Sequence, residues 1–322
     1  MQRIWRTWQT NLRHSDAMSI SNVQMGLAVK THDERQRGAS AAFGALSLCV
    51  TIFGCGGADK APAKGVGATS AHVYIELPNS SNSYFPRGDA AALGLDVPAI
   101  DALIDEAAAT HSDALLLLKD GRVVVERYFG HRPRPTALMS VTKGLVSLAV
   151  GALLDEGKIA SVDSPVSTWF PEWGEGLKAK VTLRHVLTHT SGLEHPGPAT
   201  LYKQADRLAY ARQLPVIEEP GKHVSYNNEA VELLSGIVRL AAGKPLDAYM
   251  REKIFEPMGI VEASWDKDSA GNVQTFADLK MFPRDLAKIG QMMLDGGQWN
   301  GKPTCSCVSR SRGLFGRPRR AA

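Results

Sequence analysis

Ser140 and Lys143 form a Ser-x-x-Lys sequence at the start of an apolar stretch that runs to Glu156. A spacing of three places the two side chains on one face of a helix. A serine hydroxyl becomes a good nucleophile when a neighbour accepts its proton, and a desolvated lysine can have its pKa lowered enough to do so. The N–H groups of a helix amino terminus also stabilise a developing oxyanion. The pair therefore predicts a nucleophilic serine with a lysine activator, and the alternative is a surface serine beside a solvated lysine.

Tyr226 and Asn228 form a Tyr-x-Asn sequence just before a helical pattern that begins near Glu229. On its own, such a tyrosine is typical of a half-buried core side chain, and such an asparagine is typical of a helix N-cap. Ser-x-x-Lys followed later in the chain by Tyr-x-Asn is a known pair of catalytic motifs, so the presence of Ser140 and Lys143 makes a catalytic role of Tyr226 and Asn228 the favoured interpretation.

The two motifs together resemble those of the serine beta-lactamase and penicillin-binding-protein family, in its class C beta-lactamase, esterase and D-aminopeptidase-like branch. The resemblance extends from about Val97 to Lys302 and includes three longer stretches, at 151–159, 182–192 and 254–259. It implies an α+β fold of the beta-lactamase/transpeptidase-like type, in which an antiparallel sheet flanked by helices lies beside an all-helical region. The active site would lie in the cleft between these two parts.

The same resemblance implies an acyl-enzyme mechanism with Ser140 as the nucleophile. Ser140 would attack an ester, amide or beta-lactam carbonyl, Lys143 and Tyr226 would shuttle the proton, and water would release the acyl group. Asn228 would hydrogen-bond Lys143 or the substrate amide, and the N–H of Ser140 would form half of the oxyanion hole. The expected partner is a small-molecule or peptide-like substrate, and no cofactor is implied.

The elements that must position these residues follow from periodicity and turn residues. Two strand-like runs, 114–118 and 122–129, are joined by Lys119, Asp120 and Gly121 and predict a β-hairpin. Helical periodicity predicts helices over 98–110, 140–156, 182–188, 229–242, 246–254 and 283–294.

Composition divides the chain into four regions. Residues 1–55 form an extension that contains an export-type segment, and residues 56–92 form a linker with Gly, Ala and Ser. The hydrolase domain is expected at 93–303, followed by an Arg-, Ser- and Cys-rich tail at 304–322.

The apolar run Ala39–Phe53 follows basic residues and is shorter than the about 20 apolar residues that span a bilayer. It predicts a cleaved export signal and hence a periplasmic or cell-envelope protein. The residues before Cys55 are similar to the lipobox of bacterial lipoproteins, so Cys55 is a lipidation candidate that would anchor the protein to a membrane. Ordinary cleavage nearby is the alternative, and Met18 or Met25 would give a more usual length ahead of the signal.

Charge and cysteine usage exclude other classes. The net charge of +4 for 322 residues gives no basis for a nucleic-acid partner. The four cysteines lie outside the central region and indicate neither a disulfide framework nor a zinc site there. His185 and His189 have the spacing of metal ligands on a helix, but no glutamate stands between them as in His-Glu-x-x-His, so no metal site is predicted.

After Lys302 the resemblance stops abruptly, because the tail lacks apolar periodicity. This predicts a frameshift near Pro303 and the absence of the C-terminal strands with a third motif, Lys-Thr-Gly or His-x-Gly. Losing one oxyanion donor typically costs about a hundredfold to a thousandfold in turnover. The sheet would be reduced mainly to the hairpin at 114–129, which is marginal by itself. An impaired serine hydrolase is therefore expected, and the alternatives are a non-catalytic penicillin-binding-like envelope protein and an inactive pseudogene product.

Overall fold

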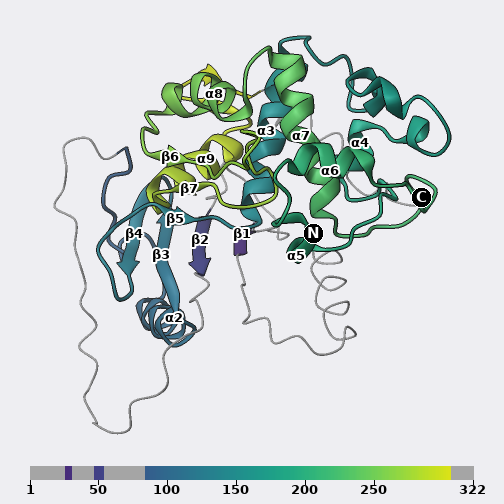
Figure 1. Cartoon of the computed structure of the whole chain (residues 1–322). Coiled ribbons are helices and arrows are strands. Elements are labelled where there is room, and N and C mark those ends of the chain that lie inside the picture. Colours follow the sequence, from purple (N-terminus) through teal and green to yellow (C-terminus); the bar gives the residue numbers. More distant parts are fainter. Residues whose placement is uncertain (1–25, 31–46, 54–83, 306–322) are drawn as a thin grey trace, which may run out of the picture.

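The computed structural model describes residues 26–30, 47–53 and 84–305, with the backbone alone described for the first two segments. The described chain has two parts (Figure 1). An antiparallel sheet with helices on its two faces forms one part, and a group of helices forms the other. Cys55, most of the linker and most of the tail lie outside the described residues.

The main sheet has four described strands in the order β1-β2-β3-β4, each antiparallel to its neighbour. The strands are β1 Gly26–Lys30, β2 Ser47–Phe53, β3 Ser112–Lys119 and β4 Arg122–Tyr128. β3 and β4 are the predicted hairpin. Asp120 and Gly121 both have a positive φ, 51° and 69°, as the two-residue turn that matches the twist of paired strands requires.

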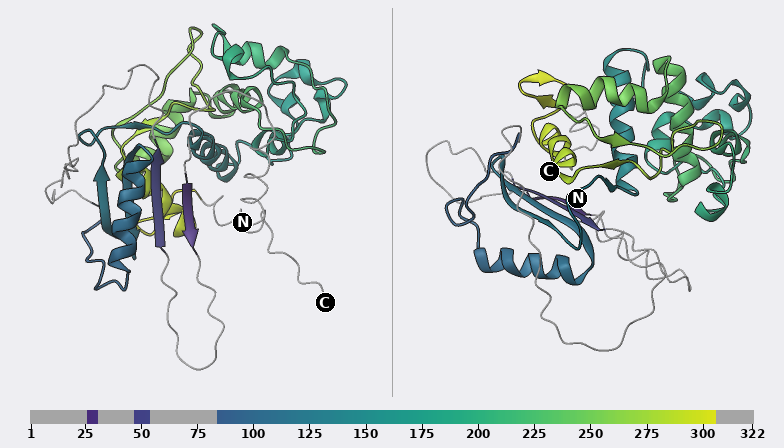
Figure 2. Two further views of the ribbon diagram at one scale, coloured as in Figure 1. Left: turned by 90° about the horizontal axis from the view of Figure 1, so that it is seen from below. Right: turned by 60° about the vertical axis from the view of Figure 1, so that its left-hand side comes forward.

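Alternate residues of the hairpin pack against different helices. One face, with Leu115, Leu117 and Val125, packs on α2, Val97–Ala109. The opposite face, with Leu116, Leu118 and Val123, packs near Ala287 of α9, Pro283–Leu294. Figure 2 shows α2 lying against the side of the sheet that is turned away from the helical part. Both faces of β3 are therefore buried, which explains its continuous apolar sequence.

β2 extends the sheet beyond the hairpin, so the expectation of a sheet reduced mainly to the hairpin is wrong. β2 pairs with β3 from Ser47 opposite Lys119 to Ile52 opposite Ala114. β2 coincides with the second half of the run Ala39–Phe53. A short apolar run fits a buried strand as well as an export signal, so composition did not reveal this pairing. Removal of the run would leave the edge of β3 unpaired.

The helical part is built around two central helices, α3 Val141–Asp155 and α7 Asn228–Ala242, which contact each other. α7 also contacts the shorter helices α4 Leu183–Leu187, α6 Arg207–Gln213 and α8 Leu246–Met250. Gly236 of α7 permits the close approach of α6, because a Cβ there would lie 2.7 Å from a methyl group of Leu208 and 3.0 Å from the ring of Phe170. Ser140 thus begins one of the most buried helices of the protein.

Most predicted helices agree with the structure to within a residue or two, and one does not. The helix expected at 246–254 ends at Met250, and the next turn, η4 Arg251–Phe255, is π-helical. Pro257 lacks the N–H that would continue the α-helical ladder to the Lys253 carbonyl.

The remaining elements are short. They are α5 Pro198–Leu201, η1 Val166–Thr168, η2 Pro171–Trp173, η3 Lys178–Lys180, η5 Glu256–Met258, a small sheet of β5 Thr136–Ala137, β7 Lys280–Met281 and β6 Ala263–Ser264, and a hairpin of β8 Gln298–Trp299 and β9 Lys302–Pro303. Cys305, at the end of the described chain, is disulfide-bonded, which the positions of the cysteines did not predict. Among the described residues, no helix is long and apolar enough to cross a bilayer.

Candidate active site

Ser140 is the N-cap residue that immediately precedes α3. Two hydrogen bonds to Leu279 fix the backbone around it. The N–H of Leu138 donates to the carbonyl of Leu279 at 2.8 Å, and the N–H of Leu279 donates to the buried hydroxyl of Thr142 at 3.3 Å. Met139 has a φ of 44°, an uncommon value for a residue other than glycine. The Ser140 side chain makes no capping bond to α3. Its Oγ therefore remains available to other groups.

The Oγ atom of Ser140 is contacted by both predicted partners. The Nζ atom of Lys143 donates to it at 3.1 Å, and the hydroxyl of Tyr226 donates to it at 2.8 Å. Nζ also donates to the carbonyl of Phe276 at 2.6 Å and lies 4.8 Å from the centre of the Tyr226 ring. Three separate segments thus meet at the pair formed by Ser140 and Lys143.

The pKa values of Lys143 and Tyr226, the two groups that contact Oγ, are shifted in opposite directions. Burial lowers the pKa of Lys143 to about 7. Burial raises the pKa of Tyr226 above its usual value of 10, although its hydrogen bond with Ser140 acts in the opposite direction. Near neutral pH the lysine can therefore be a neutral amine, while the tyrosine keeps its proton. This combination suits Lys143 as a base and Tyr226 as a proton donor.

Tyr226 is positioned by the start of α7, where Asn227 and not Asn228 is the N-cap. The Asn227 side chain accepts from the N–H of Ala230 at 2.7 Å and donates to the carbonyl of Leu193 at 2.7 Å. The alternative reading of Asn228 as the N-cap is therefore wrong by one residue. Asn228 is the first residue of α7, and within the described chain its buried Oδ1 atom accepts no hydrogen bond.

The carbonyl of Phe276 was not found from the sequence, because a backbone acceptor has no residue-type signature. It is held in place by Glu232, a fully buried residue of α7. The Glu232 carboxyl group accepts from the N–H and the hydroxyl of Thr275, at 3.1 and 2.9 Å. Burial raises the pKa of Glu232 to about 8. A carboxyl group deep in the helical part thereby fixes the segment that faces Lys143.

The two histidines considered as metal ligands have different partners. The Nδ1 atom of His185 accepts from the N–H of Thr182 in a capping box at the start of α4. The Nδ1 atom of His189 accepts from the N–H of Asn227 at 3.2 Å. A third histidine, His195, lies with its Nε2 atom 2.9 Å from the hydroxyl of Ser225, next to Tyr226.

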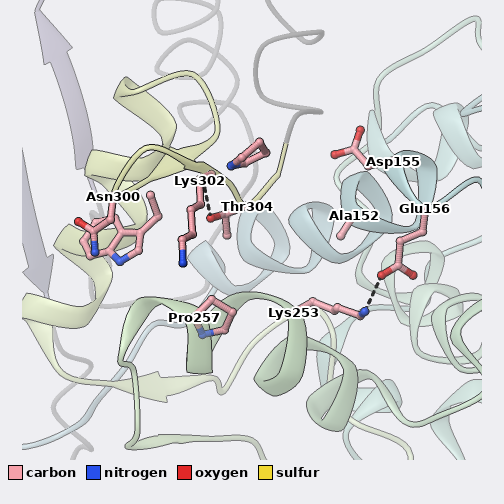
Figure 3. A pocket seen from close by; sticks show the side chains of 10 residues that line it. Ala152, Asp155, Glu156, Lys253, Pro257, Asn300, Lys302 and Thr304 are labelled. Atoms are coloured by element: carbon pink, nitrogen blue, oxygen red, sulfur yellow. Dashed lines mark hydrogen bonds and ion pairs between the residues drawn. The ribbon is translucent and has the colours of Figure 1, made fainter.

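A cavity of about 410 Å³ lies elsewhere, at the opposite end of α3 (Figure 3). Its lining includes Ala152, Glu156, Lys253 and Lys302. A helix rises about 1.5 Å per residue, so Ala152 is about 18 Å along the helix from Ser140. The Glu156 carboxylate is paired with Lys253 at 2.8 Å. The cavity is thus separate from the serine and its partners.

A comparison with known protein families shows to which family the chain belongs. The family model described as Beta-lactamase matches residues 100–303, well over half of the chain. The chain belongs to the beta-lactamase family.

Individual members of this beta-lactamase family include hydrolases of several kinds. The chain is 32% identical over 144 residues to esterase EstB of Burkholderia gladioli, a match that covers 38% of this chain and 36% of the esterase. It is 28% identical over 230 residues to the 6-aminohexanoate-dimer hydrolase of Paenarthrobacter ureafaciens, covering 64% of this chain and 57% of that enzyme. The chain therefore spans less than two thirds of the length of either relative. These relatives support assignment as a hydrolase.

The fold agrees with the family. The structure of the octameric penicillin-binding protein homologue from Pyrococcus abyssi superimposes with a TM-score of 0.55 at 22% identity, covering 67% of this chain and 60% of that one. The predicted α+β fold of the beta-lactamase/transpeptidase-like type is confirmed.

Proposed function

We propose that this protein is a serine hydrolase that forms an acyl-enzyme on Ser140 with an ester, amide or beta-lactam carbonyl. The observation that supports this most directly is the contact of one serine oxygen with both a lysine amine and a tyrosine hydroxyl, at 3.1 and 2.8 Å. A base and a proton donor on the same oxygen are what acyl transfer requires.

In the first step, neutral Lys143 takes the proton of Ser140 as Oγ forms a bond with the carbonyl carbon. Tyr226 gives its proton to the leaving group, the bond between carbon and leaving group breaks, and Lys143 restores the tyrosine proton. Water then attacks the acyl carbon and its proton goes to Lys143. The bond to Oγ breaks as Lys143 returns that proton to Oγ, which restores the serine hydroxyl and the neutral amine. The N–H of Ser140 is the proposed donor to the oxyanion.

Asn228 is the proposed contact for Lys143 or for the amide of the substrate. Its buried and unpartnered Oδ1 atom supports this role, because a buried acceptor without a donor costs about 1–3 kcal/mol unless a ligand or another group satisfies it. A substrate N–H would satisfy it on binding.

Export to the cell envelope, with lipid attachment at Cys55 as its anchored form, is part of the proposal. It rests on the sequence of the apolar run Ala39–Phe53 and on the cysteine that follows the run. Cleavage before Cys55 would remove β1 and β2 and leave the edge of β3 unpaired in the mature protein. The amino-terminal residue of protein recovered from a bacterial envelope tests it, since lipidation would leave a modified Cys55 at the new terminus.

The central test is labelling and turnover measured on the same sample. A fluorescent penicillin and a fluorophosphonate are incubated with the wild-type protein and with Ser140→Ala, and the labelled residue is identified by mass spectrometry. Hydrolysis of p-nitrophenyl acetate is measured in parallel. We expect Ser140-dependent labelling and hydrolysis. Labelling without hydrolysis would instead identify a non-catalytic penicillin-binding protein, and labelling that survives Ser140→Ala would refute the assignment of the nucleophile.

A further inference from the structure

His189 makes three contacts with the three residues centred on Tyr226. Its ring stacks on the Tyr226 ring, with centres 4.7 Å apart and planes 27° from parallel. Its Nδ1 atom accepts from the N–H of Asn227 at 3.2 Å, and its carbonyl accepts from the N–H of Ser225 at 2.8 Å. The residues on both sides of the tyrosine, and the tyrosine ring itself, are therefore in contact with one residue.

Tyr226 needs such support because of where it lies. It precedes α7, so its peptide groups are outside the hydrogen-bond ladder of that helix. The residue is 47% exposed, so its neighbours enclose its ring only in part. A tyrosine hydroxyl that must stay within 2.8 Å of a nucleophile gains from a fixed ring. From these contacts we infer that His189 is a positioning residue that fixes the Tyr226 hydroxyl on Ser140.

The state of the His189 ring is consistent with this role. Burial, and to a lesser extent the nearby charge of Lys143, lowers the pKa of His189 to about 4, against the opposite effect of the Asn227 N–H. The ring is therefore neutral at pH 7, with Nδ1 free of a proton and able to accept. A charged ring would lose this bond and would repel the Lys143 ammonium group.

The backbone of His189 restricts which residues can replace it. Its φ of 57° lies in the left-handed region, where asparagine is tolerated far better than most other residues. His189→Asn keeps an acceptor of similar reach and a compatible backbone while it removes the stacked ring. His185→Asn is a matched control, because His185 belongs to the same segment and contacts Thr182.

The test is a double-mutant cycle, and its kinetic arm rests on the proposed function. We expect His189→Asn to lower kcat for p-nitrophenyl ester hydrolysis by about tenfold to a hundredfold, with a smaller change in KM. In a Tyr226→Phe background the same substitution should change kcat by less than about twofold, because the hydroxyl that it positions is already absent. An equal loss in both backgrounds would overturn the inference and leave a general structural role. His185→Asn should show no dependence on the Tyr226 background.

A second readout keeps this inference separate from the proposed function. Protein labelled with 3-fluorotyrosine gives a fluorine resonance for Tyr226, identified by its absence in Tyr226→Phe. We expect His189→Asn to shift and broaden this resonance, since the stacked ring is lost. A shifted resonance in a protein without Ser140-dependent hydrolysis would refute the proposed function alone. An unchanged resonance would refute the positioning role, whatever the activity.

Discussion

The pH dependence of acylation tests whether Lys143 is the base. Its amine must be neutral to accept the proton of Ser140, and burial lowers its pKa to about 7. About a tenth of the molecules would carry a neutral Lys143 at pH 6, about half at pH 7 and about nine tenths at pH 8. A lysine with the ordinary value of 10.5 would be neutral in only about 0.3% of molecules at pH 8.

The expected profile of kcat/KM follows from these fractions. It should rise about tenfold per pH unit below pH 6, rise about tenfold in all between pH 6 and 8, and then level off. His189 and Tyr226 titrate outside this range, since the pKa of His189 is lowered to about 4 and that of Tyr226 is raised above 10. Glu232, whose pKa is raised to about 8, titrates within it but contacts Thr275 at 2.9 and 3.1 Å and not the reacting oxygen.

The assay is hydrolysis of p-nitrophenyl acetate between pH 5 and 9, followed at an isosbestic wavelength and corrected with Ser140→Ala. Lys143→Arg is the matched variant, because its guanidinium keeps its charge and should leave little activity at any pH. A rate that continues to rise tenfold per unit to pH 9 would refute a lowered lysine pKa. A rate that is flat from pH 5 to 8 would refute Lys143 as the base.

Three further predictions concern stability, each measured by thermal and chemical unfolding. Glu232→Ala should lower the free energy of unfolding by about 2–4 kcal/mol, because it leaves the N–H of Thr275 without its acceptor and creates a cavity, whereas Glu232→Gln should cost less; equal losses in the two variants would contradict this. A chain that begins at residue 56 lacks β1 and β2 and should melt at a lower temperature than the full chain, and an unchanged melting temperature would show that these strands do not stabilise the sheet. Gly236→Ala should cost about 1–3 kcal/mol because its Cβ would overlap Leu208, while Gly144→Ala, where the Cβ meets open space, should be neutral or stabilising by about 0.5–1 kcal/mol.

Much of the site could be predicted because its chemistry depends on residue types at fixed spacings. Ser140 and Lys143 lie one helical turn apart, so their contact is a local property of α3. Tyr226 is remote in sequence, and only the family resemblance linked it to the serine. The N-cap of α7 was misplaced by one residue, because asparagine is a favoured N-cap residue and the sequence does not distinguish Asn227 from the adjacent Asn228.

What could not be predicted depends on contacts between distant segments. The carbonyl of Phe276 acts through the backbone, so any residue at that position could supply it. The pairing of β2 with β3 is non-local, and an apolar run gives no information about its partner. His189 was weighed as a metal ligand from its spacing to His185, whereas its contacts are with the segment around Tyr226.

The bond from Lys143 to the Phe276 carbonyl has a consequence for the timing of charge during the reaction. A neutral amine has two N–H groups and one lone pair. With one N–H already on the carbonyl at 2.6 Å, the remaining orientations of the amine are restricted, and the lone pair can face Ser140. When the proton arrives, the new ammonium ion already has the dipole of the Phe276 carbonyl in place to stabilise it. The segment around Thr275 and Phe276 therefore provides a fixed carbonyl dipole that stabilises the positive charge of Lys143, a charge that exists only while Lys143 holds the transferred proton.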